Sequence, residues 1–211
     1  MCTLFEQILE PDKLREELCE DGTELSGMGA DAPVEWRTWP GERVAVGKGL
    51  AHLRLLGLSE EGKLASQTAD EQYSLTTTGE ELTEGRHYWE LKISGTEYGD
   101  IFVGVCKPDA DPMHMPSSAH WYLMCFTDGS LNGNGKSWSD KAGSFIESDR
   151  MGILLDLDDG SLRFFRNGVE HGPGYPAGSV TGPVARAALT VWTGNAVQLL
   201  PDAAWPAGHS R

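Results

Sequence analysis

The chain has 211 residues, a formal net charge of −15 and 39% hydrophobic residues, enough to build the core of one domain and little more. The acidic balance excludes nucleic acid and anionic membrane surfaces as expected partners. No stretch approaches the ~18 consecutive apolar residues of a membrane span, and the first residues lack the pattern of a signal peptide. The four cysteines have no zinc-ligand spacing, which favours reduced thiols in a cytoplasmic protein.

The first part of the chain differs in composition from the rest. Residues 1–31 hold nine acidic and two basic side chains. Leu4 and Ile8 pair at i,i+4, which predicts a short helix within residues 3–19, and a glycine-rich linker follows. We therefore expect residues 1–33 to form an acidic helical extension. Its apolar stripe is too small to stand alone, so it should pack either on the domain or on a partner, in the second case as a tether in a larger assembly.

From residue 34 onward, short apolar runs alternate with turn residues, the pattern of an antiparallel sandwich. In His87–Ile93, apolar and polar residues alternate, so one face of this strand should be buried. Ile101–Val105 and Trp121–Phe126 are apolar throughout and should lie deep. No long helical pattern follows any strand, which argues against parallel βαβ units.

Turn residues predict how some of the later strands pair. Met151–Leu157 and Leu162–Arg166 flank a turn of Asp, Asp, Gly and Ser, so they should form a hairpin, and Asn167-Gly168 supplies another tight turn. We also expect Val184–Trp192 and Ala196–Leu200 to pair with each other. The predicted fold class is all-β: a bent two-sheet antiparallel β-sandwich over residues 34–206, followed by a tail of residues 207–211.

The order of these pieces resembles the SPRY domain family. The matching segments are Glu84–Leu91, Ile101–Val105, Asp128–Ser130 with Asn134–Lys136, Met151–Leu157, Gly160–Gly168 and Tyr175–Ala177. The resemblance implies a concanavalin-like sandwich that recognises a peptide or a protein surface with loops at one end. It implies no catalytic residues and no cofactor.

SPRY domains that carry a SOCS box are the branch that this chain resembles most. Val191-Trp192-Thr193-Gly194 is similar to their Val-Trp-Gly turn, with one residue inserted, and the regions Pro112–His114 and His120–Trp121 are similar to the aromatic site that lines their peptide pocket. The early loop, Ser66–Tyr73, lacks their Arg-x-Pro-x-Ala stretch. We therefore expect no SOCS box after the sandwich.

Three segments are expected to meet at one end of the sandwich: Ser66–Tyr73, Lys107–Trp121 and Trp192–Asn195. Aromatic side chains lose little entropy on binding and often anchor interfaces. We therefore expect a half-exposed Trp192 to form one wall of the site and a half-exposed Trp121, or Tyr122, to form the other; the alternative for both tryptophans is packing in the core. The predicted partner-binding residues are Gln72, Tyr73, Pro112, Met113, His114, His120, Trp121, Tyr122, Val191, Trp192, Thr193 and Gly194.

Other chemistry finds little support in the sequence. Ser130–Ser137 resembles a phosphate-binding loop but begins with Ser where Gly is required, so it is interpreted as a hairpin. The acidic turn Asp156–Asp159 does not follow the calcium-loop pattern. We predict no catalytic residue, no metal and no cofactor. The leading function is a protein–protein interaction module, and the alternatives are a structural subunit docked in a large assembly or a lectin-like carbohydrate binder.

Overall fold

The computed structural model describes most of the second of the two units into which the chain divides after Pro33. The predicted helical extension, residues 1–33, lies outside the described residues. The described part contains strands and turns without a helix, and hence no helix long and apolar enough to cross a bilayer. The described residues are 37–38, 56–59, 63–67, 74–78, 80–95, 101–110, 119–190, 194–201 and 203–211.

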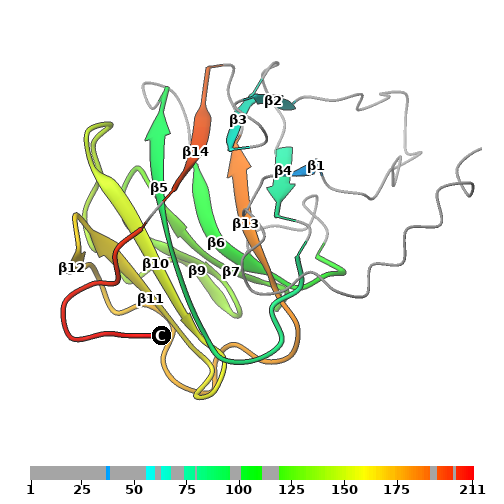
Figure 1. Ribbon diagram of the computed structural model, residues 1–211, viewed down its shortest axis with the longest axis vertical. Helices are drawn as coiled ribbons and strands as arrows, with labels where there is room; N and C mark the ends of the chain where they lie inside the picture. Colours follow the sequence, from blue (N-terminus) through cyan, green and yellow to red (C-terminus); the bar gives the residue numbers. More distant parts are fainter. Residues whose placement is uncertain are drawn as a thin grey trace, which may run out of the picture. The chain divides into compact units, whose positions relative to one another are not determined.

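The described strands form two antiparallel sheets, which we call sheet A and sheet B (Figure 1). Sheet A has the order β1 (Arg37–Thr38), β4 (Ser74–Thr77), β13 (Ala185–Thr190), β6 (Phe102–Cys106), β7 (Trp121–Cys125), β8 (Leu131–Gly133) and β9 (Lys136–Ser139). Sheet B has the order β12 (Val169–Glu170), β11 (Ser161–Arg166), β10 (Arg150–Asp156), β5 (Arg86–Ser94), β14 (Ala196–Leu200), β3 (Leu64–Gln67) and β2 (Leu56–Ser59).

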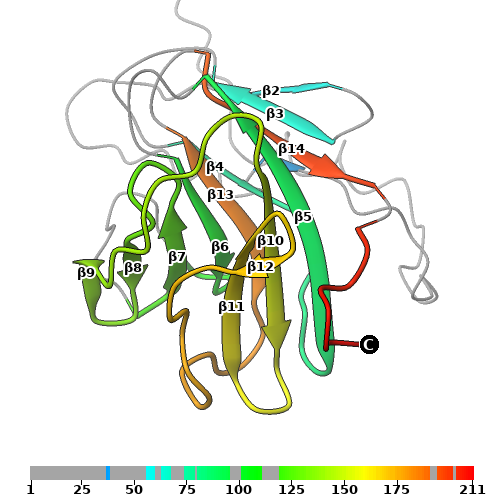
Figure 2. The ribbon, with the colours of Figure 1, turned by 90° about the vertical axis from the view of Figure 1, so that its left-hand side faces the viewer.

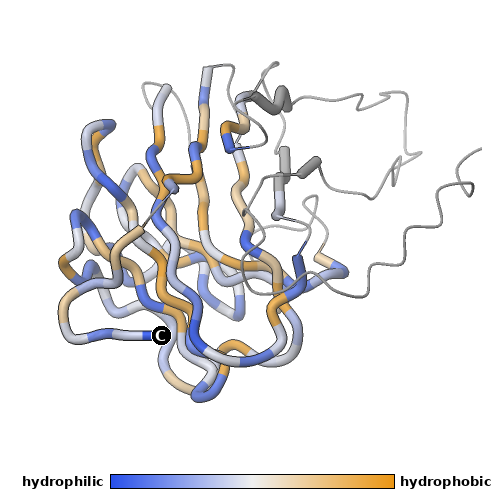
Figure 3. Tube along the Cα trace, in the orientation of Figure 1, coloured by the Kyte–Doolittle hydropathy of each residue, from blue (hydrophilic) through white to orange (hydrophobic). Residues whose placement is uncertain are grey.

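The core lies between the two sheets and follows the period-two alternation of the strands. Trp89, Leu91 and Ile93 point inward from β5, and Val103 and Val105 point inward from β6, all of them at most 4% exposed. The apolar stretches of the tube in Figure 3 follow these central strands. Each buried aliphatic side chain contributes roughly 1.5–3 kcal/mol, so these strands hold the sandwich together. The predicted all-β sandwich is confirmed.

The predicted hairpins are also confirmed. β10 pairs with β11 from Met151 opposite Arg166 to Asp156 opposite Ser161. At the next turn Asn167 and Gly168 both have positive φ, 52° and 81°, the conformation of a type I′ turn. The segment that resembles a phosphate-binding loop folds as the β8–β9 hairpin.

The expected pairing of the last two strands is wrong. β13 lies between β4 and β6 in sheet A, whereas β14 lies between β3 and β5 in sheet B. The chain therefore crosses from one sheet to the other between Thr190 and Ala196. Both strands obtain their hydrogen bonds from partners far away in the sequence, which a reading of neighbouring segments does not detect.

The strand register defines two ends of the sandwich. At one end, β13 finishes at Thr190 opposite Ser74, and the connection to sheet B passes through Gly194 to Ala196, which pairs with Ser94. We call this the Gly194 end; it is uppermost in Figures 1 and 2. At the opposite end, β13 begins with Ala185 paired to Cys106.

Candidate protein-binding surface

Three connections converge on Gly95 at the Gly194 end. The amide of Gly95, just after β5, donates to Oε1 of Glu147 at 2.8 Å. A Cβ atom at Gly95 would lie 2.9 Å from the nitrogen of Asn195 and would overlap the carbonyl oxygen of Gly194. The φ of Gly95 is +76°, which glycine adopts without strain. Gly95 thus joins the β5–β6 connection to the β13–β14 connection by backbone contact, and to the β9–β10 connection by a hydrogen bond to the Glu147 side chain.

Asp149 fixes two neighbouring turns of the same end to each other. Its Oδ2 accepts the amide of Ile146 at 2.9 Å and its Oδ1 accepts Nδ2 of Asn167 at 2.7 Å. Arg166 Nε lies 2.7 Å from the carboxylate, whose side chain is 5% exposed. Burial alone would raise the pKa of Asp149, but these hydrogen bonds and the Arg166 charge hold it below its usual value. The β9–β10 connection and the β11–β12 turn therefore form one rigid unit.

Two exposed apolar side chains lie on this unit. Among the described residues, the large hydrophobic side chains left exposed are Trp138 at 39%, Ile146 at 56% and Val169 at 70%. Ile146 belongs to the turn held by Asp149, and Val169 directly follows the turn that contains Asn167. Isolated exposed apolar residues are common, but a group of them at one end of a domain indicates an interaction surface.

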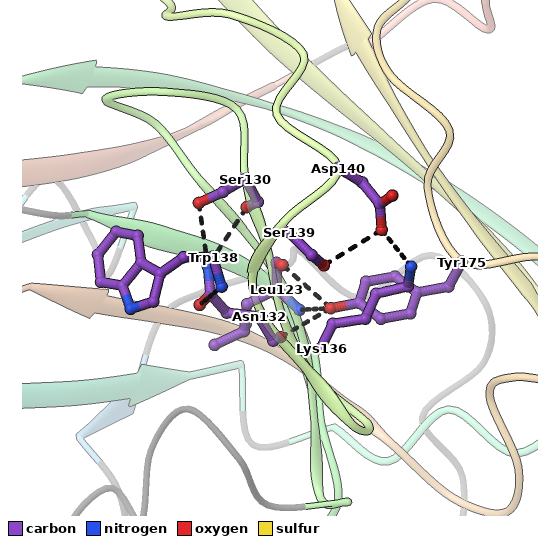
Figure 4. A network of polar contacts seen from close by, with 8 residues as sticks. All are labelled: Leu123, Ser130, Asn132, Lys136, Trp138, Ser139, Asp140 and Tyr175. Carbon is purple, nitrogen blue, oxygen red and sulfur yellow. Dashed lines mark hydrogen bonds and ion pairs between the residues drawn. The ribbon is translucent and has the colours of Figure 1, made fainter.

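Trp138 lies on the edge strand β9 in an unusual conformation (Figure 4). Its φ is +50°, which is rare for a bulky residue. Its amide donates to Oδ1 of Asn132 at 3.0 Å, and Nδ2 of Asn132 lies 3.3 Å from Oγ of Ser130. The indole packs edge-on against Phe102, the first residue of β6, with ring centroids 5.4 Å apart. Asn132 thereby holds a partly exposed tryptophan beside the Gly194 end.

Tyr175 braces the hairpin that carries Trp138 (Figure 4). Its hydroxyl accepts the amide of Leu123 at 3.1 Å and lies 2.7 Å from the carbonyl oxygen of Asn132. The residue is 1% exposed, and burial raises the pKa of its hydroxyl, so it remains neutral. The contact joins β7 and β8 to the chain that precedes β13.

The expected convergence of three segments at one end is wrong. Cys106 pairs with Trp121, and the amide of Lys107 donates to the carbonyl of His120 at 2.9 Å. The β6–β7 connection therefore leaves the sheet at the end opposite Gly194. β6 and β13 are antiparallel neighbours in sheet A. The connection that follows β6 therefore leaves the sheet at one end, and the connection that follows β13 leaves it at the other.

The two described aromatic residues of the predicted site are not half-exposed. Trp121 is 0% and Tyr122 2% exposed. Trp121 belongs to a second apolar cluster with Phe102 and Leu189, while Tyr122 faces the main core and packs edge-on against Tyr175 at 5.5 Å. Because β7 is apolar on both faces, each face packs against a different apolar cluster. Trp121 and Tyr122, the expected walls of a pocket, are therefore core side chains.

The other predicted partner-binding residues divide into two groups. His120 is partly exposed, with Nδ1 3.6 Å from Asp109, and Gly194 is exposed. The remaining residues lie outside the described part of the chain and stay predictions: Gln72, Tyr73, Pro112, Met113, His114, Val191, Trp192 and Thr193.

Sequence reasoning missed Ile146, Val169 and Asp149. Ile146 and Val169 each stand next to turn residues and a glutamate, outside the periodic runs that identify core strands. The sequence feature that could have identified Ile146 and Val169 is a large apolar residue within a polar turn, because burial does not explain an apolar residue at such a position. Asp149 could be found only through its contacts with Arg166 and Asn167, which lie in a different hairpin.

The acidic turn uses its carboxylates on the protein itself. Oδ1 of Asp158 accepts the amide of Gly85 at 3.1 Å, and Oδ1 of Asp159 accepts the amide of Ser161 at 2.8 Å. Asp156 forms an ion pair with Arg86 at 3.0 Å. Within the described ranges, no group of three His, Cys, Asp or Glu side chains is arranged to hold a metal ion.

The two described cysteines behave as apolar core residues. Cys106 and Cys125 are both free and buried, as the sequence pattern predicts. Burial, with a smaller contribution from the Asp109 charge, raises the pKa of the Cys106 thiol to about 12. A thiol with such a pKa is not a nucleophile at neutral pH. Cys2 and Cys19 lie outside the described residues.

Comparison with known proteins identifies a family match and curated relatives. The family model of the SPRY domain matches residues 86–199. Tripartite motif-containing protein 5 of Pongo abelii is 28% identical over 108 residues, which cover 43% of this chain and 21% of that protein. The match thus spans about a fifth of the length of this relative.

Solved structures share the architecture of sheets A and B. The SPRY domain of human HERC1 has a TM-score of 0.60 at 16% identity and covers 69% of this chain and 92% of that chain. The TRIM65 PSpry domain has a TM-score of 0.55 at 16% identity, with coverages of 70% and 86%. Stonustoxin has a TM-score of 0.52 at 23% identity, with coverages of 69% and 25%. At these identities the likeness shows the fold alone.

Proposed function

This chain belongs to the SPRY domain family, whose members are generally non-catalytic and commonly mediate protein–protein interactions, and we propose that it binds a protein partner through the Gly194 end. The observation that carries this proposal is the exposure of Ile146 and Val169 on turns that Asp149 holds rigid. Apolar side chains presented on a pre-ordered surface contribute to affinity, because little conformational entropy is lost when the partner binds.

Two of the sequence-predicted segments fit this surface. The connection that contains Val191, Trp192 and Thr193 runs between Thr190 and Gly194, and the segment with Gln72 and Tyr73 directly precedes β4. The strand register supports the proposal that both connections leave their sheets at the Gly194 end. We therefore propose Trp192 as the central anchor, because tryptophan is the residue type most often found at interface hot spots.

The β6–β7 connection is not included in the proposed surface. Its described ends, Lys107 and His120, lie at the opposite end of sheet A. Loops at either end of a rigid sandwich can vary without disturbing the core, so a role for Pro112, Met113 and His114 would require a second, separate contact.

The proposal is tested by affinity capture with two double variants. Ile146→Asp with Val169→Asp places charges on the proposed surface, and Thr83→Asp with Ala177→Asp places them on exposed positions of the opposite end. We expect the first pair to lose, by at least tenfold, partner proteins that wild type retains from a native lysate, and the second pair to keep them. Equal retention by both pairs, with melting temperatures like that of wild type, would show that the Gly194 end is not the binding surface.

A further inference from the structure

The outer face of sheet B carries an apolar strip that the core does not use. Leu154 and Phe165 occupy the positions that alternate with the inward residues of β10 and β11, yet both are only 2% exposed. Tyr88 of β5 lies beside them, with its ring edge-on to Phe165 at 6.0 Å. A Cβ atom at Gly152 would overlap the Tyr88 hydroxyl, so this glycine provides the space in which the tyrosine ring lies across the sheet.

Residues 203–211 cover this strip. The Trp205 ring lies 5.8 Å from that of Tyr88 at an angle of 35°, and the His209 ring lies 5.7 Å from that of Phe165 at 81°. Figure 1 shows the segment in red, folding back from β14 toward β10 and β11. Two aromatic contacts therefore fix the segment to the outer face of the sheet.

Arg86 binds the same segment at three points. Its Nη1 donates to the carbonyl of Ser210 at 2.6 Å, and its Nη2 lies 3.4 Å from Nδ1 of His209. Its guanidinium carbon lies 5.6 Å from the centre of the Trp205 ring. The ion pair with Asp156 holds the arginine in place. A rigid guanidinium that contacts a carbonyl, an imidazole and an indole together is typical of a recognition residue.

The segment binds as a short peptide would. None of residues 203–211 forms part of a strand ladder. The chain turns at Pro206–His209, where the His209 amide donates to the Pro206 carbonyl at 3.0 Å and Gly208 has a φ of +82°. Pro206 is buried, whereas the alanines on either side of the Trp-Pro pair and Ser210 are exposed. A few anchors separated by exposed residues are also the pattern with which short peptides are recognised.

We propose that the outer face of β5, β10 and β11 is a peptide-binding site for a short tryptophan–proline segment, and that residues 203–211 occupy it in cis. The site is separate from the Gly194 end and does not depend on the function proposed for that end. A tethered segment acts at an effective concentration of roughly millimolar, so a partner segment gains access only when the cis segment is released.

The test measures binding of a fluorescein-labelled peptide with the sequence of residues 203–211 to the full chain, by fluorescence anisotropy. Trp205→Ala removes the main anchor of the cis segment, so this variant should bind the peptide at least tenfold more tightly than wild type. The same peptide with alanine in place of its tryptophan should not bind. Trp138→Ala, which removes an exposed tryptophan elsewhere, should bind like wild type.

His209→Ala provides a second variant in case Trp205→Ala does not fold, and it should also bind more tightly than wild type. Equal peptide affinity for wild type and for every folded variant would overturn the proposal, and so would equal binding of the peptide that lacks tryptophan. In either case residues 203–211 would be a fixed cover of the sheet.

Discussion

The backbones of Gly95 and Gly194 lie so close together that a Cβ atom on Gly95 would overlap the Gly194 carbonyl oxygen. This contact joins the end of β5 to the beginning of β14. It fixes the point at which the chain crosses from sheet A to sheet B, beside the proposed surface.

The first prediction compares two glycines with nearly the same backbone conformation. Gly95 and Gly178 have φ values of +76° and +79°, but a Cβ atom at Gly178 would meet nothing within 4 Å. Gly178→Ala should cost only the strain of a left-handed residue, about 1–2 kcal/mol. Gly95→Ala adds a backbone collision and should cost about 1–3 kcal/mol more. Urea unfolding measures both, and equal losses would contradict the contact.

The second prediction concerns the pH dependence of stability at Asp149. Its folded-state pKa is lowered, so its contribution is fully present above the unfolded-state pKa of about 3.9 and is lost as the pH falls through the lower folded-state pKa. Asp149→Asn should cost about 2–3 kcal/mol at pH 7, since it weakens buried hydrogen bonds to a charged group. The difference from wild type should narrow below about pH 4.

The control for this prediction is Asp140→Asn. Asp140 forms an exposed ion pair with Lys136, and surface pairs contribute little to stability. The Lys136 and Ser139 hydrogen bonds also lower the pKa of Asp140, but water screens this exposed pair, so the variant should differ only slightly from wild type from neutral to acidic pH. If the difference in stability between Asp149→Asn and wild type is equally small and does not change with pH, the Asp149 network does not hold the two turns together.

The parts of the fold that follow from local sequence could be predicted. The alternation of Trp89, Leu91 and Ile93 identifies a strand with one buried face, and the Asn167-Gly168 pair identifies a tight turn, because both signals lie within a few residues. Local signals could not show that β13 and β14 belong to different sheets. Their true partners, β6 and β5, are distant in the sequence, and adjacency along the chain suggested a hairpin.

The candidate site was harder to predict for the same reason. The end at which a connection lies depends on the register of non-local strand pairs, so the β6–β7 connection was assigned to the wrong end. Whether an aromatic is exposed depends on what covers the outer face of its sheet, and β7 has apolar residues on both faces. Trp121 therefore appeared to be available for binding although it is fully buried.

The third prediction follows from this burial. Trp121→Ala should destabilise the domain by about 3–5 kcal/mol, because it leaves a cavity in the second apolar cluster. Trp138→Ala should cost less than about 1 kcal/mol, since that indole is partly exposed. Thermal unfolding monitored by circular dichroism distinguishes the two. A Trp121→Ala protein as stable as wild type would show that this side chain is not a core residue.

The last prediction concerns the Tyr175 hydroxyl, which satisfies the amide of Leu123 and bonds the carbonyl of Asn132 inside the protein. Tyr175→Phe keeps the ring and removes these contacts together with the one to the Leu123 carbonyl oxygen at 3.2 Å, so it should cost about 1–3 kcal/mol. Hydrogen exchange of the Leu123 amide should accelerate by at least tenfold, because its acceptor is lost. Tyr122→Phe is the matched control, since the neighbouring hydroxyl bonds the exposed Thr181, and water can replace that contact. Unchanged exchange at Leu123 in Tyr175→Phe would show that the β7–β8 pair stands without this brace, and that Trp138 is held by Asn132 alone.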